Sequence, residues 1–342
     1  MAAIDRTAYP RLSRRLSIDE LDAQYGTTSE ETTLTRKEAI GDSPRLTFLV
    51  MLKTRQQLGY FPLLGEVPEK IVNFLVDALG LPTGTALLDA RVKTKTLFRY
   101  RALIRSHVQA RVYSDAGECL IDPVVRSAAL TISDPADLIN LAIETSTQAK
   151  LELPAFSALD RLVGHLRHQV HNTLYRAITA KLDHEQVACL DALLEVPPGE
   201  STSCIAGLKE TPGPATLNHI RLWSERLARL DAIIDPKTFL AEIAHTKIRR
   251  FAAEAARLQL SDLRDLVQPG KRHTLILCLL FQAQATTRDE LVEMFLRRMR
   301  QTRHAAQDQL RILQEQHQAI EESLIGVLDQ VLHQAKCSGL QS

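Results

Sequence analysis

Apolar residues recur at helical spacing along most of the chain, with polar and charged residues between them. The stretch LSIDELDAQYG predicts a helix that Ser17 caps and Gly26 ends. The stretch DSPRLTFLVMLKTRQQLG predicts a helix that is capped by Asp42 or Ser43 and ended by Gly59. The segment VPEKIVNFLVDALG repeats this design. These signals predict a series of short helices in the N-terminal third of the chain.

The rest of the chain has the same periodicity. Asp-Pro pairs predict helix starts at Asp122 and Asp134, and FSALDRLVGHLRHQVHNTLYRAITAKL predicts a long amphipathic helix. A long polar helix is predicted towards the C-terminal end, capped by Thr286 or Thr287 and broken near Gly326. Only QARVYSDAGECLI has the turn residues expected of a hairpin. The pattern therefore predicts an all-α, multi-helical fold.

Composition limits the class of protein. The 342 residues are 45% hydrophobic, which is enough for two or three domain cores, and the net charge is only +1. The N-terminal residues lack the apolar core of a secretory signal, and the longest apolar run, Leu275 to Phe281, is too short to cross a bilayer. The five cysteines form no CxxC pair and no disulfide framework. We therefore expect a soluble protein of a reducing cytoplasm.

One stretch departs from this balanced charge. From Ala90 to Ser114 the chain carries seven Lys and Arg residues and no acid: Arg91, Lys93, Lys95, Arg99, Arg101, Arg105 and Arg111. A helix is predicted over about 94–106, whose apolar face would be formed by Leu97, Tyr100, Ile104 and Val108. The basic residues would then flank that face, as in helices that contact DNA phosphates. The alternative is a merely solvated charged face.

The motifs of common enzymes are absent from the sequence. It contains no GxSxG, P-loop, GxGxxG or HExxH motif, and its acids fall mainly at helix caps. His165, His168 and His171 are spaced by three on one predicted helix, but the first and third diverge by about 120° around it, which disfavours a shared metal. We therefore expect no catalytic residues, no metal site, no cofactor and no enzyme activity in this chain.

Several segments, taken in order, resemble the N-terminal part of transposases of the Tn-three family of class II replicative transposons. The resemblance is carried by RLTFLVMLKTRQQLGYFP, VPEKIVNFLVDALGL, KTKTLFRYRALIRSH, LELPAFSALDRLVGHLRHQVHNTLYRAITAKL and TRDELVEMFLRRMRQTRHAAQDQL. Each motif is weak by itself, but together these blocks span most of residues 15 to 310 in the family's order.

The resemblance implies a role in DNA transposition, through sequence-specific binding of the terminal inverted repeats of a transposon by helix-turn-helix-like modules. By position, Lys53, Arg55, Lys95, Arg99, Arg101 and Arg105 would contact double-stranded DNA in a first module, together with Lys93 of the basic stretch, and Arg161, Arg167 and His168 would do so in a second. The family's catalytic domain lies far downstream. Whether this chain is a truncated gene, a fragment or a stand-alone regulator stays open.

The expected organisation follows from these modules. Residues 15–150 and 151–196 would form the two DNA-binding modules, 197–214 a linker rich in Pro, Gly and Ser, and 215–342 a long-helix region for dimerisation. Leu310, Leu313, Ile320, Leu324, Leu328 and Val331 form an apolar stripe on the last helix. This stripe is compatible with a homodimer, or with an alternative function as a helical scaffold without specific DNA binding. It is equally compatible with packing of the helix back onto the chain's own core. With DNA as its partner, the protein would be associated with the nucleoid.

Overall fold

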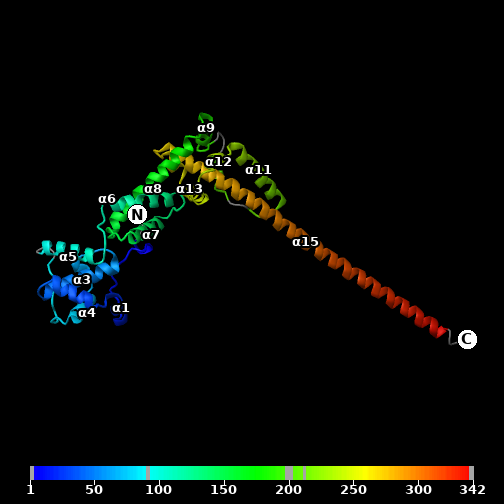
Figure 1. Ribbon diagram of the computed structural model, residues 1–342. Coiled ribbons are helices and arrows are strands. Elements are labelled where there is room, and N and C mark those ends of the chain that lie inside the picture. Colours follow the sequence, from blue (N-terminus) through cyan, green and yellow to red (C-terminus); the bar gives the residue numbers. More distant parts are fainter. Residues whose placement is uncertain (1–3, 90–92, 197–202, 211–212, 339–342) are drawn as a thin grey trace. The chain divides into compact units, whose positions relative to one another are not determined.

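The computed structural model is all-α, as the sequence predicts (Figure 1). It describes residues 4–89, 93–196, 203–210 and 213–338. Within these residues the only β-type pairing is a single parallel bridge between Arg111 and Leu151. No helix of the described residues combines the length and the apolar character that crossing a bilayer requires.

The chain divides into two compact units. Unit 1 comprises Met1–Ala177 and Ile243–Arg250, and unit 2 comprises Ile178–Glu242 and Phe251–Ser342. Along unit 1 the helices are η1 (Ile4–Arg6), α1 (Ile18–Tyr25), α2 (Ser29–Glu38), α3 (Asp42–Leu58), η2 (Leu64–Glu66), α4 (Glu69–Leu79), α5 (Thr94–His107), α6 (Asp115–Ala129), α7 (Pro135–Gln148) and α8 (Phe156–Thr179). The predicted module boundaries at 150 and 196 stay predictions.

The first core of unit 1 surrounds α3. This helix contacts α1, α2, α4 and α5 (Figure 1), and every residue from Leu46 to Arg55 is buried. Phe48 of α3 meets Tyr100 of α5 edge-on, with 5.1 Å between the ring centroids. Because α3 has neighbours on all sides, its polar residues are buried as well as its apolar ones.

The second core of unit 1 lies among α6, α7 and α8. Ile121 and Val125 of α6, Leu138 and Ile139 of α7, and Leu159 of α8 are fully buried in it. The N-terminal segment joins this core through Tyr9, whose ring packs edge-on against Phe156 at 5.5 Å. Together the two cores contain most of the buried apolar residues of this unit.

Most predicted helix ends are confirmed. Ser17 and Glu20 form a capping box at α1, and Asp134 caps α7 by accepting a hydrogen bond of 2.9 Å from the backbone N–H of Ala136. Gly59 and Gly80 end α3 and α4 in the left-handed conformation that glycine adopts without strain. The predicted cap at Asp42 or Ser43 is wrong, because Gly41 is the N-cap residue and no side chain caps α3.

The region around α6 differs from the sequence prediction. Instead of a hairpin followed by a helix from Asp122, one helix runs from Asp115 to Ala129 through Pro123. Gly117, which suggested the turn of the hairpin, is buried in the first turn of α6, where an added Cβ would lie 3.1 Å from the Tyr113 ring. The glycine therefore serves close packing and not a turn.

Unit 2 is built on the N-terminal third of α15 (Pro269–Ser338). The other helices are α9 (His184–Ala192), α10 (Cys204–Gly207), α11 (Leu217–Ile233), α12 (Pro236–Leu240), α13 (His245–Arg257), whose first residues belong to unit 1, and α14 (Leu260–Arg264). In Figure 1, α11 lies alongside α15, and Leu275–Leu280 are buried there. Of the predicted linker, 197–202 and 211–212 lie outside the described residues.

The predicted start of the long helix is wrong. α15 begins at Pro269, eighteen residues before Thr287, and it continues without a break through Gly326. Thr287 is buried inside the helix instead of capping it, and the Glu290 carboxylate accepts a hydrogen bond of 2.8 Å from the Trp223 indole of α11. The predicted cap Thr287 therefore lies inside α15, and Glu290 is used for a contact with α11.

Candidate nucleic-acid interface

α5 has one buried face and one basic face. Leu97, Tyr100 and Ile104 point into the first core, which confirms the predicted inner face, whereas Val108 at the C-cap is half-buried. Lys93, directly before the helix, and Lys95 and Arg99 on it are exposed. The packing of the inner face fixes the direction in which these cations project.

The arginines of α5 are ordered by contacts that leave positive charge at the surface. Arg99 donates a hydrogen bond of 2.9 Å to the carbonyl of Glu38 at the C-terminal end of α2. The Arg101 guanidinium lies 5.8 Å from the ring centroids of both Phe61 and Phe98. A cation over an aromatic face keeps its charge while its side chain loses freedom. Such contacts hold both guanidinium groups in place before any ligand binds.

Arg105 is the one cation of α5 that forms an ion pair among the described residues. Its Nε lies 2.7 Å from Oε2 of Glu152, and both side chains are largely buried. Arg55 of α3 is also buried close to this pair. Burial lowers the pKa of Arg55, whereas Glu152 acts to raise it and Arg105 to lower it. Arg55 and Arg105 therefore form, with Glu152, a cluster behind the surface, and the exposed charge comes from the other cations of α5.

The C-terminal end of α5 is fixed by a junction, a short backbone pairing between the segments that follow α5 and α7. Gln109 after α5 and Lys150 after α7 both have left-handed backbone conformations, with φ of 53° and 52°. The chain then forms two hydrogen bonds of 2.8 Å, from Arg111 N–H to the Lys150 carbonyl and from Glu152 N–H to the Arg111 carbonyl. The junction therefore attaches the basic helix to the second core of unit 1.

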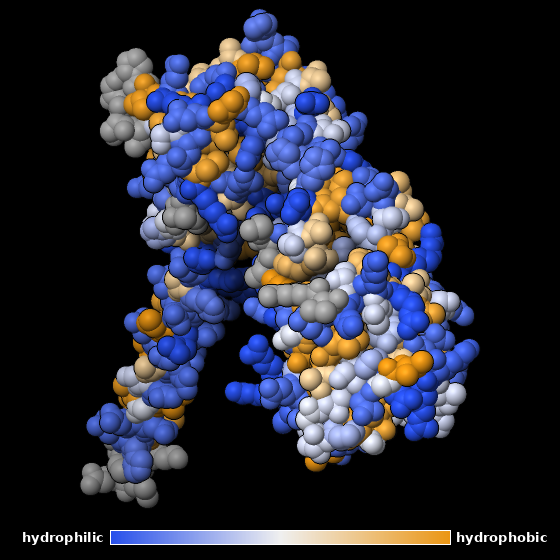
Figure 2. Space-filling view, turned by 90° about the vertical axis from the view of Figure 1, so that its left-hand side faces the viewer, coloured by the Kyte–Doolittle hydropathy of each residue, from blue (hydrophilic) through white to orange (hydrophobic). Residues whose placement is uncertain are grey.

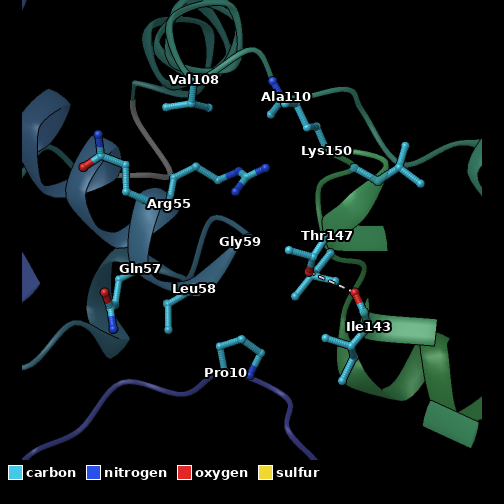
Figure 3. Close-up of a pocket in the computed structure, with 13 residues that line it drawn as sticks. Pro10, Arg55, Gln57, Leu58, Gly59, Val108, Ala110, Ile143, Thr147 and Lys150 are labelled. Carbon is cyan, nitrogen blue, oxygen red and sulfur yellow. Dashed lines mark hydrogen bonds between the residues drawn. The ribbon is translucent and has the colours of Figure 1, made fainter. Parts of the chain in front are cut away.

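A cavity of about 460 Å³ lies beside this junction (Figure 3). Arg55 extends into it from α3, and Lys150 stands on the opposite side with its Nζ 3.2 Å from Oε1 of Gln109. The Nε atom of Arg55 is buried without a hydrogen-bond partner in the described part of the chain. No carboxylate lines this cavity, so its walls carry positive charge only.

Lys53 lies apart from the basic surface. Its side chain is 7% exposed, and its Nζ lies 3.2 Å from Oε2 of Glu31 on α2. The Glu31 carboxylate also accepts hydrogen bonds from the Gln56 side chain and from the backbone N–H of Thr28. Because its ammonium group is already paired inside the core, Lys53 is not part of the surface that the α5 cations form.

The second predicted group lies on α8, in the second core. Arg161 and His168 are exposed there, whereas Arg167 is half-buried and donates a hydrogen bond of 3.4 Å to the Ser133 carbonyl. His165 contacts the Gln169 amide at 2.7 Å. Within the described residues no cluster of three or more His, Cys, Asp or Glu could hold a metal ion.

The cations of α13 are functional candidates that were not predicted from the sequence. Lys247 is fully buried; its Nζ donates to the Ile132 carbonyl at 2.7 Å and lies 3.2 Å from Nε2 of His171. Burial lowers the pKa of Lys247 to about 8, and the charges of Arg167 and Arg250 act in the same direction. The run KIRR within an amphipathic segment was the signal that could have identified them.

Arg249 and Arg250 of α13 border a groove of about 780 Å³ in unit 1. The residues that line it are Arg6, Thr131, Ile132, Ser133, Asp134, Pro135, Asp137, Thr246, Arg249 and Arg250. The two carboxylates reduce its positive charge, and Arg6 is paired with Asp134. The groove is thus more balanced than the surface of α5, which carries no acid.

Comparison with known proteins supports the resemblance that the motifs carry. Residues 1–166 match a family model described as a domain of unknown function, DUF4158. The chain is 24% identical over 282 residues to the transposase of transposon Tn501 from Pseudomonas aeruginosa, covering 81% of this chain and 28% of that protein. It is 22% identical over 337 residues to the transposase of Tn3926 from Escherichia coli, covering 94% and 32%.

A third relative, the transposase of Tn1546 from Enterococcus faecium, is 22% identical over 252 residues, covering 73% of this chain and 25% of that protein. The chain thus spans a quarter to a third of the length of these relatives. The prediction that the protein is not an enzyme is contradicted, because the relatives are transposases, which are enzymes that transfer DNA strands. By sequence, the chain is similar to these transposases over most of its own length.

Proposed function

We propose that the protein takes part in DNA transposition and that unit 1 binds duplex DNA through the basic face of α5. The observation that carries this proposal is the set of cations Lys93, Lys95, Arg99 and Arg101 on or beside one helix with no acid among them. The similarity to transposases over most of the chain supports it independently.

The arrangement of α5 suits the chemistry of a phosphate backbone. Each cation that meets a phosphate releases condensed counterions, so several cations on one rigid helix add their effects. The buried face of α5 and the junction at Arg111 hold the helix in place, which reduces the entropy lost on binding. Phe98, 61% exposed beside Arg101, adds an apolar contact for sugar or base edges.

The DNA target and a second protein–DNA contact, on α8, are also part of the proposed function. We infer that the DNA is the terminal inverted repeat of a transposon, and that Arg161 and His168 of α8 contribute a second set of contacts, with Arg167 supporting them from its half-buried position. Such a protein would work on the nucleoid, in the cytoplasm. A homodimer agrees with this function, because the two ends of a transposon are equivalent sites.

The alternative, a helical scaffold without specific DNA binding, is not favoured by the comparisons, since the relatives are transposases. The proposal is tested with a variant in which Lys93, Lys95 and Arg99 are replaced by Ala. Arg105 is left intact because its ion pair with Glu152 is structural. The matched control replaces Arg14, Arg15 and Lys70, which are exposed cations of unit 1 outside α5.

Fluorescence anisotropy would measure the affinity for a duplex carrying the transposon end and for a scrambled duplex, between about 50 and 200 mM salt. We expect the α5 variant to bind both duplexes more weakly and to lose about 0.9 from the slope of log K against log salt for each phosphate contact removed. The control variant should keep the slope of the wild type. An α5 variant with unchanged affinity and slope would refute the proposed interface.

A further inference from the structure

The distal part of α15 exposes its described side chains. Beyond Met294, every described side chain as far as Gln334 is exposed, on all faces of the helix. Large apolar residues are among them: Leu310 is 56% exposed, and Leu313 and Ile320 are 61% exposed. In Figure 2 this part of α15, at the lower left, carries hydrophobic side chains along its length. A helix this exposed and this apolar is typical of one that buries a face against a partner.

The apolar residues follow a heptad repeat. If Leu310 takes position a, the a positions are Leu296, Arg303, Leu310, His317, Leu324 and Val331, and the d positions are Val292, Met299, Ala306, Leu313, Ile320 and Val327. Ten of these twelve residues are apolar, and the register continues without a break. A repeat of seven residues keeps one stripe facing a partner along a two-stranded coiled coil.

We propose that this stripe pairs with the same stripe of a second copy of the chain, in an antiparallel coiled coil. The surface lies in unit 2, so the proposal goes beyond DNA binding by α5 and does not depend on it. The distribution of charge along the helix favours both an identical helix as the partner and the antiparallel direction.

Charge is distributed along the helix in two opposite blocks. From Phe295 to Ile312 there are five arginines and one acid, a net charge of +4, whereas from Leu313 to Leu332 there are four acids and no Lys or Arg, a net charge of −4. An antiparallel pair of identical helices places each block against the opposite block of the partner. A parallel pair would place like against like over the whole length, which is unfavourable.

The apolar layers agree with this direction when the pair is centred between Arg311 and Ile312. Leu310 then meets the partner's Leu313, and Leu324 meets the partner's Met299. The two polar a residues each meet an uncharged d residue. Arg303 faces the partner's Ile320, and His317 faces the partner's Ala306, which has a small side chain. In a parallel pair Arg303 would face its own copy inside the seam, and so would His317.

The flanking positions add one specific contact. In this register Arg300, at position e, lies beside the partner's Glu321, also at e, and symmetry makes this pair twice. The other flanking residues near the centre are uncharged glutamines, among them Gln309 beside the partner's Gln316. In a parallel pair Arg300 would lie next to the partner's Phe295, at position g, with no acid in reach. The pair of Arg300 and Glu321 therefore distinguishes the two directions.

Sedimentation equilibrium of the full chain without DNA tests the identity of the partner. We expect a dimer at tens of micromolar, and we expect Leu310→Glu with Leu313→Glu to give a monomer, because both residues lie in the central layers. Far-ultraviolet circular dichroism before centrifugation would verify that the variant is folded. A wild-type chain that stays monomeric at about 100 µM would overturn the proposal.

A charge exchange tests the direction. Arg300→Glu should weaken the dimer on the order of ten-fold, because it places two acids side by side twice, and Arg300→Glu combined with Glu321→Arg should restore it. The control Arg298→Glu makes the same change in charge at position c, away from the seam, and should have a much smaller effect. The antiparallel pairing would be overturned if adding Glu321→Arg to Arg300→Glu did not restore the dimer. It would also be overturned if Arg300→Glu and Arg298→Glu weakened the dimer equally.

Discussion

Lys53 and Glu31 illustrate how tertiary contacts decide the role of a charged residue. Both side chains are less than a tenth exposed, and they pair at 3.2 Å between α2 and α3. Burial acts to raise the pKa of Glu31, but hydrogen bonds from Thr28, Gln56 and Lys53 and the charge of Lys53 outweigh it, so that this pKa lies below its ordinary value. The native state therefore prefers the ionised carboxylate.

This preference makes a prediction about pH. Because the pKa of Glu31 is lower in the folded than in the unfolded state, its contribution to stability is present above the ordinary value of 4.5 and is lost as the pH falls through the folded-state pKa. Glu31→Gln leaves the Lys53 charge buried and unpaired, so we expect it to lower the free energy of unfolding by about 3 kcal/mol near neutral pH. Urea denaturation at several pH values measures this loss.

The loss should diminish as the pH falls from 4.5 through the lower folded-state pKa, because the wild-type carboxyl group then becomes protonated as well. The neighbouring Glu30 is exposed on the same helix, so Glu30→Gln is the control and should change stability by less than about 0.5 kcal/mol. A Glu31→Gln variant as stable as Glu30→Gln at neutral pH would mean that the pair contributes nothing.

The sequence predicts single helices well where local signals dominate. The spacing of Leu97, Tyr100 and Ile104 predicts both α5 and its buried face, and the glycines after α3 and α4 predict their ends. The same reasoning misplaced Lys53, because periodicity assumes that a helix has a solvent face, whereas α3 is enclosed by four neighbours. For the candidate site, it found the cations of α5 but missed Lys247, whose burial depends on long-range packing.

The proline inside α6 allows a test of how one missing hydrogen bond affects the stability of a helix. Pro123 lies inside the helix, where it has no N–H to donate to the Cys119 carbonyl one turn earlier. Pro123→Ala restores this donor, so we expect the free energy of unfolding to rise by about 1 kcal/mol or more. Thermal unfolding followed by circular dichroism would detect the increase.

Pro135 is the matched control for this substitution. It occupies the first position of α7, directly after the N-cap Asp134, where a helix N–H has no partner within the helix. Pro135→Ala should therefore give no increase in stability. If both substitutions stabilise the chain equally, the gain does not come from the hydrogen bond that Pro123 removes from α6.

For the molecule as a whole, α15 combines a buried part and an exposed part in one continuous helix. Leu275–Leu280 are buried in unit 2, whereas the side chains of 295–332 are exposed. Because most helical stability in proteins comes from packing, the proposed pairing predicts that the exposed part depends on association for its order. Its stability should therefore depend on protein concentration, and that of the buried part should not.

Hydrogen–deuterium exchange read by mass spectrometry tests this difference within one sample. We expect peptides from 296–331 to exchange markedly faster at about 1 µM than at about 100 µM protein, because dilution separates the pair. Peptides covering 275–280 should exchange at the same slow rate at both concentrations. Equal protection of 296–331 at both concentrations would show that its order does not come from a second copy.

The unbroken register of α15 also limits how the length of this gene can change in evolution. An insertion of seven residues between Val292 and Val331 keeps all apolar positions on one side of the helix. Insertions of three or four residues rotate everything beyond them by about 60° or 40°, which moves the following leucines away from the seam. Among descendants of this sequence, we therefore expect the insertions and deletions that are retained in this segment to be multiples of seven residues.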